Sequence, residues 1–147
     1  MQGTYNMNGF HIDSQTLPSV VAVVDDETDI IRAIETLMTF KALRCSSHGS
    51  AESLLSALSL HEGRLCLKTA DGQCALVAAV LLDMNLPEMN GADLVVALRR
   101  LQPDVRLVMM TAALNEAVDS RALDLQGVTL LEKPFDLESL EQALQLV

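Results

Sequence analysis

The stretch VAAVLLDMNLPEMNG, residues 77–91, is an apolar run that ends on an acid and leads into a turn. A near-continuous apolar run is typical of a strand buried on both faces of a parallel sheet. Pro87 and Gly91 indicate that the chain turns after Asp83 before a helix begins. Asp83 is therefore predicted at the carboxyl end of a central strand.

Three other apolar runs also lead to polar residues. They are VVAVV (20–24) before Asp25 and Asp26, VRLVMM (105–110) before Thr111, and VTLL (128–131) shortly before Lys133. Parallel α/β sheets bind ligands beyond the carboxyl ends of their strands. These side chains are therefore predicted to share one pocket although they are far apart in the sequence.

Apolar residues at helical spacing separate the runs. Helices are expected from Ile30 to about Leu43, from Ser50 through Leu58, over 94–101, over 117–125 and from Leu137 onward, with Ser50 and Asp136 as N-caps. Residues 44–47 are a short strand candidate. This alternation predicts one doubly wound α/β domain, a five-stranded parallel sheet flanked by five helices.

Two segments do not follow this alternation. The first seventeen residues are polar and aperiodic, so residues 1–17 are predicted to be a flexible leader and 18–147 the domain. Residues 63–74 lose the periodic pattern, and Asp71-Gly72 is a turn signal that fits either a short hairpin or a loop.

The composition narrows the class of protein. Ten Lys and Arg against twenty Asp and Glu give a formal charge of -10, which argues against direct binding of nucleic acid or of anionic membranes. The longest apolar run, Ala75–Leu82, has eight residues, well short of a membrane span. The N-terminal sequence lacks a signal peptide pattern, and the three cysteines lack zinc-site spacing, so we expect a cytoplasmic protein with reduced thiols.

The chemistry expected at the strand ends is that of phosphate. Crowded carboxylates repel one another, and a divalent cation relieves that repulsion, with Mg²⁺ or alternatively Mn²⁺ preferred over zinc by oxygen ligands. Asp83 is the best nucleophile, because Asp25 and Asp26 are adjacent and better placed to hold a metal together. Thr111 could donate a hydrogen bond to a phosphoryl oxygen, and Lys133 could neutralise its charge.

The joint pattern resembles the receiver domain of two-component response regulators, which are CheY-like. The residues that carry the resemblance are DDE at 25–27, LLDMNLPEMNG at 81–91, MMTAA at 109–113 and LEKPF at 131–135. The resemblance covers nearly the whole chain after the leader. It implies a flavodoxin-like fold with strand order 2-1-3-4-5, and a signalling domain that catalyses only its own phosphorylation and dephosphorylation.

The resemblance also implies a role for each site residue. Asp83 would be the phosphoacceptor, with a sensor histidine kinase or a phosphotransfer protein as donor and a downstream effector or output domain as receiver of the signal. Asp25, Asp26 and Asp83 would bind Mg²⁺ together with the backbone carbonyl of Asn85. Thr111 would contact the phosphoryl group, and Lys133, in a cis peptide bond with Pro134, would pair with it.

The chain departs from the family pattern in two places. Leu130 stands where the family usually has Tyr or Phe, so we predict weakened or altered switching at the last helix. Asp26 and Asp83 are 57 positions apart, roughly a dozen more than relatives need, and the excess falls near residues 63–74. This insertion is either a tolerated surface loop or an element that binds a partner or forms a homodimer.

Two other functions remain as alternatives. A pseudo-receiver would be an interaction module without control by phosphorylation, which Leu130 and the insertion make conceivable. An aspartyl-phosphate phosphatase usually carries a second acid two residues after the nucleophile, where this chain has Asn85. A native N-terminus at Met1 would favour a stand-alone or N-terminal receiver.

Overall fold

The structure is a computed structural model that describes residues 4–5, 11–12, 17–112 and 127–145. The strands of its main sheet are β3 (Ser19–Val24), β4 (Arg44–His48), β5 (Leu58–His61), β6 (Arg64–Lys68), β7 (Cys74–Asp83), β8 (Arg106–Thr111) and β9 (Thr129–Glu132). The helices are α1 (Thr28–Phe40), α2 (Ala51–Ala57), α3 (Gly91–Leu101) and α5 (Leu137–Leu144). The helix expected over 117–125 lies outside the described residues.

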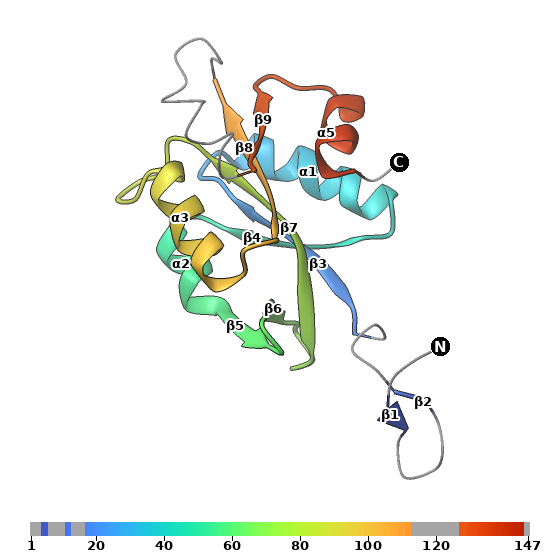
Figure 1. Ribbon diagram of the computed structural model, residues 1–147. Coiled ribbons are helices and arrows are strands. Elements are labelled where there is room, and N and C mark those ends of the chain that lie inside the picture. Colours follow the sequence, from blue (N-terminus) through green and yellow to red (C-terminus); the bar gives the residue numbers. More distant parts are fainter. Residues whose placement is uncertain (1–3, 6–10, 13–16, 113–126, 146–147) are drawn as a thin grey trace.

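Five strands form a parallel sheet in the order β4-β3-β7-β8-β9 (Figure 1). In the order of these five parallel strands along the chain this is 2-1-3-4-5, so the predicted flavodoxin-like fold is confirmed. The weak strand candidate at 44–47 is confirmed as β4, which pairs with β3. All five strands run in the same direction, which places their carboxyl ends at one edge of the sheet.

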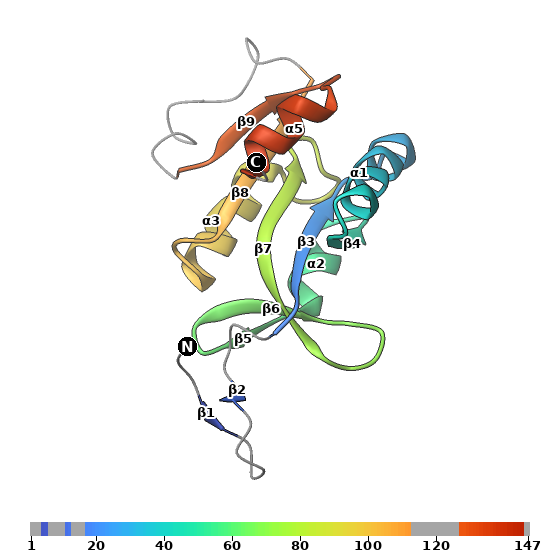
Figure 2. The same ribbon diagram turned by 90° about the vertical axis from the view of Figure 1, so that its right-hand side faces the viewer.

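Helices cover both faces of the sheet, and alternate residues of β3 show how the two cores are divided. Val21 and Val23 face α1 and α5, whereas Val20, Ala22 and Val24 face α2 and α3. Figures 1 and 2 show α1 and α5 together on one side and α2 and α3 on the other. Strands buried on both faces explain the near-continuous apolar runs in the sequence.

The helix starts were predicted better than the helix ends. Ser50 caps α2 by accepting a hydrogen bond from the Ser53 N–H, and Asp136 caps α5 in the same way at Ser139, so both predicted N-caps are confirmed. The prediction that Leu58 belongs to the helix after Ser50 is wrong. That helix ends at Ala57, and Leu58 is extended and begins β5.

The insertion folds into an antiparallel extension of the sheet. Strands β5 and β6 form a hairpin with Glu62 and Gly63 at its turn, both at positive φ, and β6 then pairs antiparallel with the start of β7. Of the two alternatives for residues 63–74, the hairpin is therefore confirmed. It is formed by β6 and the start of β7, and Gly72 lies in its turn at φ 83°. Strands β6 and β8 therefore lie along the same side of β7. Strand β6 pairs with the first half of β7, and β8 pairs with the second half.

A buried side chain joins this extension to the helical layer. The side-chain oxygen Oε1 of Gln102, the residue just after α3, accepts a hydrogen bond of 2.8 Å from the Leu65 N–H in β6. Gln102 is only 6% exposed, and its amide nitrogen donates to Asp104. Gln102 therefore satisfies a backbone donor at the point where β6 passes beyond its pairing with β7.

The remaining predictions on organisation have mixed outcomes. Thr4–Tyr5 (β1) and His11–Ile12 (β2) pair antiparallel within the predicted leader, whose flexibility stays a prediction. Cys45, Cys66 and Cys74 form no disulfide with one another, and their redox state stays a prediction. None of the helices in the described part of the chain has the length and apolar character that a membrane span requires.

Replacing Gln102 by Ala should remove the acceptor of the Leu65 N–H and leave that donor buried without a partner. We expect the free energy of unfolding, measured by urea denaturation, to fall by about 1–3 kcal/mol. Gln142→Ala, at an exposed position of α5, is the control and should change stability by less than about 0.5 kcal/mol. Equal stability of both variants would show that this hydrogen bond does not hold the extension in place.

Candidate functional site

The predicted site residues meet at the carboxyl edge of the parallel sheet. Asp25 directly follows β3, Asp83 ends β7 and Thr111 ends β8. Lys133 directly follows β9. These four side chains therefore lie at one edge of the sheet, as the sequence predicts, because neighbouring strands of a parallel sheet end side by side.

Three carboxylates form a compact cluster at this edge. One oxygen from each of Asp25, Asp26 and Asp83 lies within 4.8 Å of the other two. Asp25 is fully buried and Asp83 is 5% exposed, whereas Asp26 is exposed. Of these three acids only Asp26 is exposed, so the cluster opens to solvent on its side.

Lys133 is the cation of the cluster. Its Nζ lies 3.1 Å from Asp25 Oδ2, 3.5 Å from Asp83 Oδ1 and 3.0 Å from Glu27 Oε1. Burial works against the charge of Lys133, but hydrogen bonds to Glu27 and Asp25 outweigh it and raise the pKa of its ammonium group. Lys133 therefore stays protonated at neutral pH.

Burial and the charge of Asp25 raise the pKa of Asp83, and Lys133 opposes this shift. Backbone donors hold the carboxylates in position: the Asn85 N–H lies 3.3 Å from Asp83 Oδ1, and the Glu27 N–H lies 2.9 Å from Asp25 Oδ1. Asp25 and Asp83 are thus each held by the backbone N–H of the residue two positions further along the chain.

Glu27 is the contact that the sequence analysis did not assign. It belongs to the same acidic run as Asp25 and Asp26, and two acids at the start of a helix are usually explained by the helix dipole. Its ion pair with Lys133 joins residues 106 positions apart. Sequence spacing alone could not distinguish this role from that of an ordinary first-turn acid.

The loop after Asp83 is closed by backbone hydrogen bonds and a close approach. The Met84 N–H donates to the Met110 carbonyl at 2.9 Å, and the Gly91 N–H donates to the Met84 carbonyl at 2.9 Å. A Cβ atom at Gly91 would lie 2.8 Å from the Asp83 carbonyl oxygen and 2.9 Å from Met109 Cε. Only glycine fits there, which explains the residue at the start of α3.

Thr111 and Lys133 are linked through the backbone. The Lys133 N–H donates to the Thr111 carbonyl at 2.7 Å, and the Lys133-Pro134 peptide bond is cis, as the resemblance implies. Thr111 is 2% exposed, and its hydroxyl lies 3.8 Å from Met84 Sδ. Leu130, two positions before β9 ends, is half-buried and packs against the core on the α2 and α3 side.

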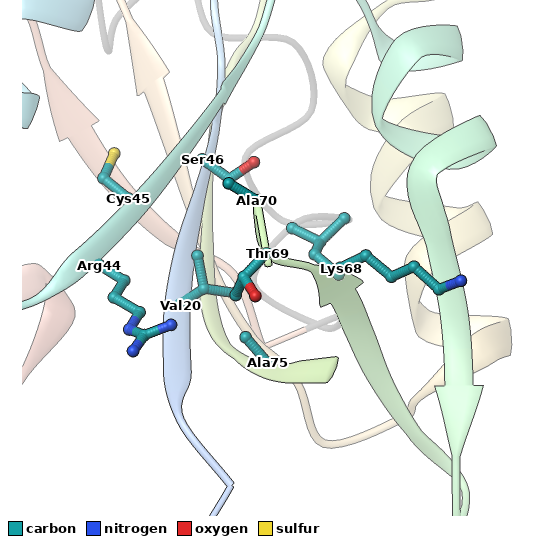
Figure 3. Close-up of a pocket in the computed structure, with 9 residues that line it drawn as sticks. Val20, Arg44, Cys45, Ser46, Lys68, Thr69, Ala70 and Ala75 are labelled. Atoms are coloured by element: carbon teal, nitrogen blue, oxygen red, sulfur yellow. The ribbon is translucent and has the colours of Figure 1, made fainter. Parts of the chain in front are cut away.

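A cavity lies elsewhere, at the opposite end of the sheet. Its volume is about 440 Å³, and it is lined by the start of β3 and β4 and by the β6–β7 turn: Val20, Arg44, Cys45, Ser46, Leu67, Lys68, Thr69, Ala70 and Ala75. Figure 3 shows the Lys68 ammonium group pointing away from the other side chains. The hydroxyls of Ser46 and Thr69 are already bonded to His48 and Asp71. This cavity is separate from the acidic cluster.

Comparison with known proteins decides the family, because residues 21–145 match the family described as "Response regulator receiver domain". The chain belongs to this family. The resemblance inferred from the sequence is therefore confirmed, and receivers of this family are signalling domains of two-component systems.

Individual relatives agree with this assignment. The chain is 30% identical over 127 residues to the DNA-binding transcriptional regulator NtrC of Azospirillum brasilense, and 26% identical over 113 residues to the response regulator SaeR of Staphylococcus aureus. These matches cover 83% and 77% of this chain but only 22% and 43% of the relatives. The receiver thus spans less than half the length of the curated relatives it matches.

Solved structures show the same fold. The chemotaxis protein CheY4 of Vibrio cholerae superposes with a TM-score of 0.65 at 22% identity, over 88% of this chain and 98% of that protein. A receiver domain from Methylobacillus flagellatus gives a TM-score of 0.65 at 26% identity, over 87% of this chain and 97% of that one. These receivers are matched almost over their full lengths.

Replacing Gly91 by Ala should strain the loop that carries Asp83, since the new methyl group meets backbone atoms that cannot move independently of the site. We expect a loss of about 1–3 kcal/mol in the free energy of unfolding, measured by urea denaturation. Gly49→Ala is the matched control, because a Cβ atom there meets nothing within 4 Å. Equal effects of the two substitutions would contradict the proposed close packing at Gly91.

Proposed function

We propose that Asp83 accepts a phosphoryl group from a sensor histidine kinase or a phosphotransfer protein. The observation that carries this proposal is the buried pair Asp25 and Asp83 beside Lys133, at the open edge of a receiver fold. A carboxylate oxygen of Asp83 forms the new bond to phosphorus while the bond from phosphorus to the donor's histidine nitrogen breaks. The domain catalyses its own phosphorylation and dephosphorylation and is not a turnover enzyme.

The carboxylate cluster suits Mg²⁺, with Mn²⁺ as the alternative. Oxygen atoms of Asp25, Asp26 and Asp83 lie within 4.8 Å of one another, which fits a hard divalent cation with oxygen ligands and retained waters. We propose that these three residues and the Asn85 backbone carbonyl hold the ion. Bound there, Mg²⁺ would neutralise charge on the phosphoryl oxygens.

Lys133 and Thr111 would bind the phosphoryl group. The ammonium group of Lys133 already lies between Asp25 and Asp83, and its raised pKa keeps it charged for an anionic ligand. The Thr111 hydroxyl lies on the adjacent strand end and can donate to a phosphoryl oxygen. Positioned charges of this kind supply most of the catalysis that phosphoryl transfer requires.

The output of the signal is proposed from the relatives. NtrC is named as a DNA-binding transcriptional regulator, and SaeR as a response regulator. We propose that phosphorylation changes a surface that a downstream effector or output domain reads, without direct contact between this domain and nucleic acid. Since Leu130 replaces the usual aromatic residue, movement at α5 should be weaker than in relatives.

A pseudo-receiver remains the second candidate, and Leu130 together with the insertion favours it. A phosphatase of small molecules has less support, because Asn85 stands where such enzymes usually carry the second acid. Acceptance of a phosphoryl group distinguishes the receiver from the pseudo-receiver. Phosphorylation by acetyl phosphate therefore tests the receiver and the pseudo-receiver together.

Incubation with Mg²⁺ and acetyl phosphate should add the mass of one phosphoryl group to the wild-type chain, measured by intact-protein mass spectrometry. Asp83→Asn should abolish the addition, because an amide cannot form the acyl phosphate. Asp93→Asn, an exposed acid in the first turn of α3, is the control and should be phosphorylated normally. No addition to the wild-type chain would favour the pseudo-receiver, and retention in Asp83→Asn would displace Asp83 as acceptor.

Asp26→Asn should weaken Mg²⁺ binding on the order of tenfold or more, because it removes one charged ligand from an exposed position without disturbing the buried pair. Isothermal titration calorimetry is the suitable measurement, since the chain has no Trp to report binding by fluorescence. Asp29→Asn, at an exposed acid in the first turn of α1, should leave the affinity unchanged. Unchanged affinity in Asp26→Asn would exclude Asp26 from the metal site.

A further inference from the structure

The ammonium group of Lys133 has as many carboxylate partners as it has N–H donors. An ammonium group offers three donors, and three carboxylate oxygens lie within 3.5 Å of Nζ: Asp25 Oδ2 at 3.1 Å, Glu27 Oε1 at 3.0 Å and Asp83 Oδ1 at 3.5 Å. The Lys133 side chain is 11% exposed. A phosphoryl oxygen can therefore take a hydrogen bond from Lys133 only if one of the three carboxylates gives up its contact.

Two of these contacts are fixed by their surroundings. Asp25 is fully buried, and its Oδ1 accepts a hydrogen bond of 2.9 Å from the Glu27 N–H. Asp83 is 5% exposed and lies 3.3 Å from the Asn85 N–H, and under the proposed function it is the residue that carries the phosphoryl group. Moving either carboxylate away from Lys133 would break a backbone contact and leave a buried charge without its cation.

The contact of Glu27 can be exchanged at little cost. The Glu27 side chain is 57% exposed, so water solvates its charge once the ion pair opens, and exposed ion pairs contribute little net stability. Glu27 is the N-cap residue of α1, but within the described part of the chain its side chain accepts no capping hydrogen bond. Its backbone carbonyl accepts from the Ile31 N–H whichever way the side chain turns. The carboxylate can therefore leave Lys133 without weakening the start of the helix.

Glu27 opposes a phosphoryl group both by position and by charge. Its Oε1 lies 3.0 Å from Nζ, a distance at which a phosphoryl oxygen would also accept from Lys133. Its negative charge repels an anionic phosphoryl donor that approaches the same ammonium group. A phosphoryl group carries a charge of about −1.5 to −2, so it is the stronger partner for Lys133 once it is attached.

We propose that Glu27 is a competing anion, which holds Lys133 in the unphosphorylated protein and is displaced from it by the phosphoryl group. This inference rests on the proposed phosphorylation of Asp83 and adds a regulation of that site. Glu27 does not touch the reacting atoms. It is a positioning residue that acts through Lys133 and sets how readily the site takes up a phosphoryl donor.

Phosphorylation of the full chain over a range of acetyl phosphate concentrations, at saturating Mg²⁺, tests the competition. Glu27→Gln should lower the KM for acetyl phosphate about threefold to tenfold and leave kcat within about twofold, because the competing charge is removed from a binding contact. Glu27→Ala removes every side-chain acceptor and should lower KM at least as far. Asp29→Asn removes the same charge from an exposed acid in the first turn of α1, and it should leave KM within about twofold of the wild type.

Carbon-13 NMR tests the displacement itself. Beryllofluoride is a non-covalent analogue of a phosphoryl group on Asp83. Its addition to the Mg²⁺-loaded wild-type chain should shift the side-chain carboxyl resonance of Glu27, which is assigned by its loss in Glu27→Gln. The carboxyl resonance of Glu62, exposed at the turn between β5 and β6, is the internal control and should stay in place.

The outcomes separate this inference from the function on which it rests. If the wild-type chain is phosphorylated but Glu27→Ala keeps the wild-type KM, or if beryllofluoride leaves the Glu27 resonance unmoved, Asp83 remains the acceptor and the inference is wrong. Equal falls in KM for Glu27→Gln and Asp29→Asn would show a general effect of charge and would also contradict it. A wild-type chain that takes up no phosphoryl group would refute the proposed function and this inference together.

Discussion

The site depends on two buried carboxylates that share one ammonium group. Asp25 and Asp83 come from neighbouring strands, and burial of two like charges at contact distance is unfavourable unless a cation lies between them. Lys133 supplies that cation from the end of β9, which is separated from β3 in the sheet by the two strands β7 and β8. The order of the strands at this edge is therefore coupled to the electrostatics of the site, since a different order would separate the charges.

Strand β7 connects this edge to the rest of the molecule. Its ten residues pair with β3 on one side and with both β6 and β8 on the other. A strand of ordinary length would serve the parallel sheet alone. The additional residues at its start give the insertion a partner, so that the insertion extends an existing sheet and does not need a core of its own.

The sequence predicted those features that depend on local pattern and strand direction. Asp25, Asp83, Thr111 and Lys133 could be placed together because each follows an apolar run, and parallel strands end at one edge. Glu27 could not be assigned, because its partner is 106 residues away and its position suits a first-turn acid equally well. Strand β5 was missed for a related reason: its leucines continue the helical spacing of α2, and only pairing with β6 makes them extended.

The two ends of β7 have different neighbours. From Leu76, the last residue of β7 that pairs with β6, to Asp83 is about 23 Å along an extended strand. The insertion therefore pairs with β7 at the end that lies away from Asp83, and its strands β5 and β6 do not reach the carboxyl ends of the parallel strands.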